Sequence, residues 1–149
     1  MVDVTNSYKQ EELIPYKKLI ASGYQDMVMT AHIVNSNVDK DFPATLSPLF
    51  LQNILRAELG YKGVIVSDDM QMGAIIDNYG FEEAIIKAVL AGCDILIVSN
   101  NNKQPYDEKM VYRAVNAVYE SVLKGEISEE KITASYNRII SLKQKYNIK

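Results

Sequence analysis

The stretch that decides the fold is Gly63-Val64-Ile65-Val66-Ser67-Asp68-Asp69-Met70-Gln71-Met72. Its β-branched segment ends abruptly in a hydroxyl and two adjacent carboxylates. Because the segment is apolar on both faces and too short for a helix, it predicts a buried strand of a parallel sheet. Side chains alternate along a strand, so Asp68 shares a face with Val64 and Val66, while Asp69 points to the other face. The two carboxylates therefore cannot share one role by simple adjacency.

Outward from this stretch, strand-like and helix-like periods alternate along the chain. We expect flanking strands at residues 27–31 and 95–99, and helices at 10–22, 48–59, 72–76, 82–91, 107–124 and 129–146. Such β-α units predict an α/β fold, with the strand at 64–67 in the middle of a parallel sheet and helices outside. No linker interrupts the pattern, so residues 1–149 read as a single unit.

Composition excludes several classes of function. The chain is 48% hydrophobic and 23% charged, with a net charge of -3 and no basic stripe, so we expect no nucleic-acid partner. No apolar run approaches the roughly 18 residues of a membrane span, and no signal peptide is visible, which leaves the compartment open. Cys93 and His32 are the only cysteine and the only histidine. We therefore expect no disulfide, no metal and no cofactor.

The three predicted strands are too few for a closed barrel. Two acids at the carboxyl end of a parallel strand lie where α/β folds place active sites. A closed eight-stranded barrel takes about 250 residues, and a sheet of three strands would leave two parallel edges unpaired. We therefore expect the chain to be part of a larger fold.

Five segments occur in a characteristic order and spacing: Asp26-Met27-Val28-Met29-Thr30-Ala31-His32, Pro43-Ala44-Thr45-Leu46-Ser47, residues 55–72, Ala91-Gly92-Cys93-Asp94-Ile95-Leu96, and residues 135–143. Together they resemble glycoside hydrolase family 3, most closely its bacterial β-N-acetylhexosaminidases, over nearly the whole chain. The resemblance implies a (β/α)8 TIM-type barrel, of which this chain would form the C-terminal three units.

The same resemblance implies a retaining glycosidase that works through a covalent glycosyl-enzyme. It places Asp68, directly after Ser67, at the position of the nucleophile. Asp69 followed by Met70 is similar to the hexosaminidase branch, because the β-glucosidase branch usually has Trp there. Glucosidase-type specificity remains the alternative within the family.

Further residues are candidates for substrate binding, each with a structural alternative. The resemblance places His32 at the floor of a sugar pocket, where it would orient Asp68 or the substrate; a lone histidine at a strand end is otherwise a hydrogen-bonded structural residue. Asp69 and Met72 are also predicted near the substrate, although Asp69 could instead cap the helix near 72–76. We expect Arg56 and Asp94 to be structural, and residues 100–102 to form loop contacts or, less favoured, to touch a sugar.

We expect the acid that the resemblance implies for this reaction to lie outside residues 1–149. In the hexosaminidase branch the resemblance implies a histidine in a Lys-His-Phe-Pro-Gly-His-Gly loop just before the segment matching Asp3-Val4-Thr5. We therefore expect residues 1–149 alone to be weakly active or inactive. The chain could also be a silent fragment, a split-chain subunit or an interaction module.

A partial barrel would also leave apolar surface uncovered. We expect self-association, or a partner that supplies the remaining strands, with these side chains left exposed on the open face: Val28, Val64, Val66, Ile95 and Ile97. The alternative is that the helix at 10–22 folds over the gap and keeps the chain monomeric.

Overall fold

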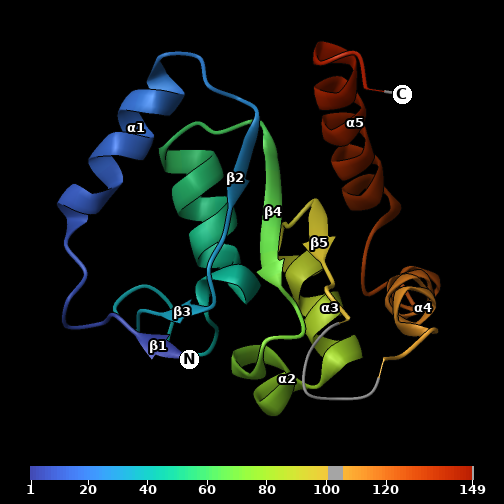
Figure 1. Cartoon of the computed structure of the whole chain (residues 1–149). Coiled ribbons are helices and arrows are strands. Elements are labelled where there is room, and N and C mark those ends of the chain that lie inside the picture. The colour runs from blue at the N-terminus through green and yellow to red at the C-terminus, as the bar shows by residue number, and fades with distance from the viewer. Residues whose placement is uncertain (101–105, 149) are drawn as a thin grey trace.

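The computed structural model describes residues 1–100 and 106–148. Its main sheet has the order β2 (Met27–Met29), β4 (Val64–Asp69) and β5 (Ile95–Ile97), and all three strands are parallel (Figure 1). This confirms the three predicted strands and their order, although β2 and β5 end two residues earlier than predicted and β4 ends two residues later. A second, two-stranded parallel sheet pairs β1 (Val2–Asp3) with β3 (Ile33–Val34), and the sequence did not predict it.

The predicted helices are present, with shifted ends. The helical elements are η1 (Gln10–Leu13), α1 (Ile14–Ala21), η2 (Ala44–Leu46), the π-helical η3 (Leu49–Glu58), α2 (Gly73–Tyr79), α3 (Phe81–Ala91), α4 (Met110–Leu123) and α5 (Glu129–Lys145). Local signals fix several boundaries. The Ser128 hydroxyl accepts from the backbone N–H of Lys131 at 3.2 Å and caps α5. Gly92, with φ at 115°, ends α3 in the left-handed region.

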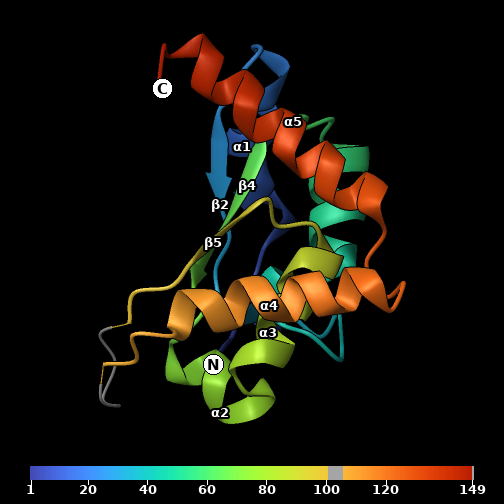
Figure 2. The same cartoon turned by 90° about the vertical axis from the view of Figure 1, so that its right-hand side faces the viewer.

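The core lies between the sheet and the helices η3, α2 and α3. Ile65 of β4 is fully buried there, as are Ile75 of α2 and Ile85 of α3. Figures 1 and 2 show α5 beside the amino ends of the strands, whereas α2 lies at their carboxyl ends. The two ends of the strands therefore differ: α5 packs at the amino ends, and the two aspartates of β4 lie at the carboxyl ends.

The expectation that Val64 and Val66 lie uncovered is wrong. They are only 1% and 8% exposed, whereas Met27 and Met29 of β2 are 45% and 61% exposed. The two valines lie on the central strand, opposite Met27 and Met29 in the register, so longer side chains flank them. Burial on this face follows strand position as well as residue type, and the exposed apolar surface lies toward the free edge of β2.

The N-terminal helix contributes little to the core. Ile20 is the only buried residue of α1, and three of its apolar side chains are exposed: Ile14, Tyr16 and Leu19. The helix therefore does not bury the apolar face that would be needed to cover the gap.

Candidate active site

Asp68 lies at the carboxyl end of β4. Its Oδ1 accepts a hydrogen bond from the backbone N–H of Asp69 at 2.7 Å, and the residue is half-buried. Among residues 1–100 and 106–148 no other hydrogen bond to this carboxylate is found. Strand alternation places Asp68 on the face opposite Ile65, away from the helix-side core. Within the described residues, the carboxylate thus retains free lone pairs on the open side of the sheet.

His32 lies beside the same strand end, as predicted. Its Nε2 is 2.9 Å from the backbone oxygen of Asp69, and its Nδ1 is 3.0 Å from the hydroxyl of Thr45. The Thr45 hydroxyl is in turn 2.8 Å from that of Thr30. The ring is only 5% exposed. Both nitrogens are therefore engaged within the chain, and this geometry favours the structural reading of His32 over substrate contact.

Asp69 ties two neighbouring strand ends together. Its carboxylate accepts from the backbone N–H of Ser99 at 3.1 Å and from the Ser99 hydroxyl at 2.5 Å, and it also accepts from the backbone N–H of Gln71 at 3.1 Å. The suggestion that Asp69 caps α2 is wrong, because the N-cap of α2 is Met72, which receives no side-chain cap. Asp69 is placed as an anchor for the β4 and β5 ends.

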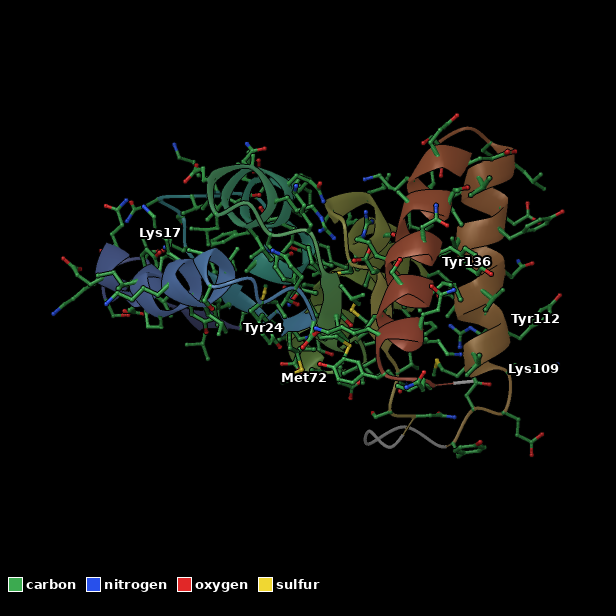
Figure 3. The ribbon with its side chains drawn as sticks, turned by 90° about the horizontal axis from the view of Figure 1, so that it is seen from above. Lys17, Tyr24, Met72, Lys109, Tyr112 and Tyr136 are labelled. Atoms are coloured by element: carbon green, nitrogen blue, oxygen red, sulfur yellow. The ribbon has the colours of Figure 1, made fainter. Side chains whose placement is uncertain are left out.

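Met72 follows the two aspartates at the start of α2. Its backbone N–H donates to the backbone oxygen of Asp69 at 3.0 Å, while the residue is 44% exposed. Figure 3 labels the Met72 side chain in a view of the molecule from above. Of the three predicted substrate-binding residues, Met72 presents the most accessible side chain, and its role stays a prediction.

The loop after β5 lies partly outside the described residues. Asn101 and Asn102, for which loop contacts were predicted, fall in that gap. The Asn100 side chain donates to the backbone oxygen of Asp107 at 2.8 Å and accepts from the N–H of that residue at 3.1 Å. Asn100 therefore closes the base of the loop.

The opposite end of the sheet holds a buried ionic cluster. Asp94, whose side chain is fully buried, pairs with Arg56 at 2.9 Å and with Arg138 at 2.7 Å. It also accepts from the Ser135 hydroxyl at 2.6 Å and the Ile65 N–H at 2.9 Å. Burial lowers the pKa of Arg56, and the negative charge of Asp94 partly offsets this decrease. The predicted structural roles of Arg56 and Asp94 are confirmed, whereas sequence reasoning missed Ser135 and Arg138 as partners of Asp94.

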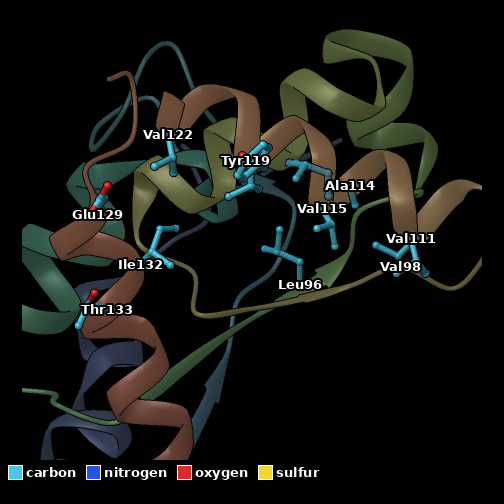
Figure 4. A pocket seen from close by; sticks show the side chains of 12 residues that line it. Leu96, Val98, Val111, Ala114, Val115, Tyr119, Val122, Glu129, Ile132 and Thr133 are labelled. Carbon is cyan, nitrogen blue, oxygen red and sulfur yellow. The ribbon is translucent and has the colours of Figure 1, made fainter. Parts of the chain in front are cut away.

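Asp68 does not line the cavity that lies between β5, α4 and α5 (Figure 4). This cavity has a volume of about 780 Å³. Its lining is mostly aliphatic, from residues that include Leu96, Val115, Val118 and Ile132. Across the described parts of the chain, no three His, Cys, Asp or Glu side chains are grouped to hold a metal ion. In the same residues, no helix is long and apolar enough to cross a membrane.

Comparison with known proteins gives one consistent result. The sequence profile described as the N-terminal domain of glycosyl hydrolase family 3 matches residues 3–142. A β-hexosaminidase A from Pseudoalteromonas piscicida is 31% identical over 147 residues, which is 91% of this chain and 25% of that protein. A β-hexosaminidase from Tolumonas auensis is 39% identical over 90 residues, which is 60% of this chain and 27% of that protein.

Solved structures agree with the sequence comparison. A family 3 β-N-acetylglucosaminidase from Paenibacillus sp. strain FPU-7 superposes with a TM-score of 0.83 at 37% identity, over 95% of this chain and 27% of that one. The β-N-acetylglucosaminidase from Thermotoga maritima gives a TM-score of 0.75 at 27% identity, over 88% and 28% of the two chains. The chain thus spans about a quarter of the length of these relatives.

Proposed function

The chain belongs to glycosyl hydrolase family 3, and we propose that it is the nucleophile-bearing part of a retaining β-N-acetylglucosaminidase. Its three adjacent parallel strands would be consecutive strands of a (β/α)8 barrel, closed by strands beyond the free edges of β2 and β5. The supporting observation is the parallel order β2-β4-β5, in which β4 ends in the two aspartates.

Asp68 is the proposed nucleophile. Its carboxylate attacks the anomeric carbon as the glycosidic C–O bond breaks, and water later releases the sugar from the covalent intermediate. One observation carries this assignment: Asp68 lies at a strand end and accepts only the N–H of the next residue among the described donors. A carboxylate held from one side in this way keeps an oxygen free for attack.

The acid that protonates the leaving group is a separate requirement. His32 is the only histidine in the chain, and it is buried with both nitrogens bonded internally, so it is not placed for this task. General acid catalysis contributes about 10²–10⁴-fold. We expect residues 1–149 alone to hydrolyse an unactivated N-acetylglucosaminide weakly or not at all.

The relatives support an N-acetylhexosaminide as the proposed substrate class. The relatives named above are β-N-acetylglucosaminidases and β-hexosaminidases. The resemblance of Asp69-Met70 to that branch supports it over the β-glucosidases. A β-glucoside is the second candidate. An aryl β-glucoside that is cleaved faster than the matched N-acetylglucosaminide would support this second candidate.

A transplant into a relative tests the proposal. Residues 3–142 would replace the matching segment of the Paenibacillus enzyme, which has the same backbone course over 95% of this chain. We expect the chimera to hydrolyse an aryl N-acetyl-β-glucosaminide, and Asp68→Asn to abolish the activity. Asp77→Asn is the matched control, because Asp77 is an exposed carboxylate on the following helix. A folded but inactive chimera would support the alternative of a silent fragment.

We also propose that a second copy of the chain covers the open side when no other strands are present. Both outer strands of the main sheet have an unpaired parallel edge within the described residues, and Met27, Met29 and Ile97 are exposed there. Open edges and exposed apolar surface favour association. Light scattering at micromolar concentration should give a dimer. A monodisperse monomer would contradict the proposal, and association only with a chain that supplies the remaining strands would identify a different partner.

A further inference from the structure

The backbone of Asp69 is the point at which the end of β4 is held. Its N–H donates to Asp68 Oδ1 at 2.7 Å, and its carbonyl oxygen lies 2.9 Å from His32 Nε2 and accepts from the Met72 N–H at 3.0 Å. The carboxylate of Asp69 is bound to Ser99. Any group that fixes this residue therefore also fixes the carboxylate of Asp68.

The hydrogen bonds of His32 can run in only one direction when the ring is neutral. A carbonyl oxygen only accepts, so the proton must be on Nε2. Nδ1 is then an acceptor, and the Thr45 hydroxyl, 3.0 Å away, must donate to it. This uses the only hydroxyl proton of Thr45, so the Thr30 hydroxyl, 2.8 Å away, donates to Thr45. The series of hydrogen bonds therefore runs from the Thr30 hydroxyl through Thr45 and His32 to the backbone oxygen of Asp69.

The residues of this hydrogen-bond series are buried, and its first member, Thr30, is anchored. The exposed fractions of Thr45, His32 and Thr30 are 0%, 5% and 9%. The backbone N–H of Thr30 donates to the Val66 oxygen at 2.9 Å, which ties the first member to β4 itself. Removing one hydroxyl would leave a buried polar atom unpaired, which is unfavourable. The donors are thus held in one arrangement.

We propose that Thr30 and Thr45 are positioning residues of the active site. Together they hold His32 in the Nε2–H tautomer, and His32 holds the Asp69 carbonyl and so the orientation of the Asp68 carboxylate. This inference rests on the proposed role of Asp68 as nucleophile. Positioning of this kind matters because a displacement of about 1 Å can cost about 10²-fold in rate.

The tautomer can be read directly, because His32 is the only histidine among 149 residues. Labelling histidine with ¹⁵N gives one imidazole in a long-range ¹H–¹⁵N correlation spectrum. At pH 8.5 we expect the Nε2–H form in the parent chain. Thr45→Val should move the two nitrogen shifts toward each other as the tautomers mix, and Thr45→Ser should restore the parent pattern. Thr133→Val, on an exposed face of α5, is the control.

The amide proton of Asp69 gives a second readout, because it donates to Asp68 Oδ1. Thr45→Val should shift this amide upfield, as the short hydrogen bond to the carboxylate lengthens, while Thr45→Ser and Thr133→Val leave it in place. An Nδ1–H tautomer in the parent, or an Asp69 amide that does not respond to Thr45→Val in a folded chain, would overturn the proposal. Both measurements are independent of activity.

In the chimera with the Paenibacillus enzyme, Thr45→Val should lower kcat by about 10²-fold with little change in KM. Thr45→Ser should retain most of the parent kcat. An active chimera that Thr45→Val leaves unchanged would overturn the positioning role. An inactive parent chimera with the expected spectra would overturn the nucleophile role of Asp68, and with it the positioning role of the threonines. The spectra would still support the hydrogen bonds from Thr30 to Asp69.

Discussion

At the amino end of β4, the buried Asp94 carboxylate receives donors from η3, from α5 and from β4 itself. At the carboxyl end, Asp68 accepts one hydrogen bond, from the backbone of the next residue, among the described donors. A carboxylate whose lone pairs are all occupied is fixed in charge and position and can only hold structure together. A carboxylate that is oriented by one donor and otherwise open is available for chemistry.

The supports of the two ends differ in kind as well. The amino end uses long side chains that reach across the sheet, with Arg138 placing α5 against the start of β5. The carboxyl end uses short groups, Thr45 and His32, that fix the backbone beside Asp68. The first arrangement joins helices to the sheet, while the second sets the position of one peptide. The ionic cluster and the proposed nucleophile thus lie at opposite ends of the same strand.

The largest effect on stability should come from Asp94→Ala. This change leaves two arginines, Arg56 and Arg138, without their buried counterion, and breaking such a pair costs about 3–5 kcal/mol. Urea unfolding followed by circular dichroism measures the loss in free energy of unfolding. A loss below about 1 kcal/mol would remove the contrast between the two ends.

A smaller loss is expected for Arg138→Met, which retains the aliphatic stem. Asp94 keeps Arg56, so the cost is that of hydrogen bonds to a charged group, about 1.5–3 kcal/mol. Amide hydrogen exchange should rise mainly in α5, which Arg138 joins to Asp94. Uniform exchange along the chain would show that the cluster does not act through α5.

The smallest effect is expected for Asp68→Asn. The substituted side chain has nearly the same volume and can still accept from the Asp69 N–H, so the free energy of unfolding should change by no more than about 0.5 kcal/mol. The same urea titration checks it. A loss comparable to that of Asp94→Ala would assign Asp68 to structure.

The sequence predicted the parts of the fold that rest on local patterns. The β-branched residues 64–66 before two acids predict β4, and the predicted helix ranges 82–91 and 129–146 match α3 and α5, which Gly92 and Ser128 bound in the structure. The strands β1 and β3 have two residues each, too short for a periodic signal. The burial of Val64 depends on the longer side chain opposite it in β2, which a single strand does not reveal.

The site could be predicted only in part, for the same reason. Asp68 directly follows the predicted strand 64–67 and lies within the observed β4, and strand alternation indicates its face. The partners of His32 are a threonine in η2 and a backbone oxygen 37 residues away, and Arg138 meets Asp94 across 44 residues. Such contacts depend on how separate elements pack, so no spacing rule along the chain indicates them.

The most direct test of a nucleophilic Asp68 is chemical rescue in the chimera. Asp68→Ala should be inactive on a 2,4-dinitrophenyl N-acetyl-β-glucosaminide until azide is added. Azide then attacks the anomeric carbon from the face that Asp68 has vacated and displaces dinitrophenolate. We predict an α-configured glycosyl azide, identified by NMR. Residual hydrolysis that azide does not change, or a β-configured azide, would contradict the assignment of Asp68 as the nucleophile.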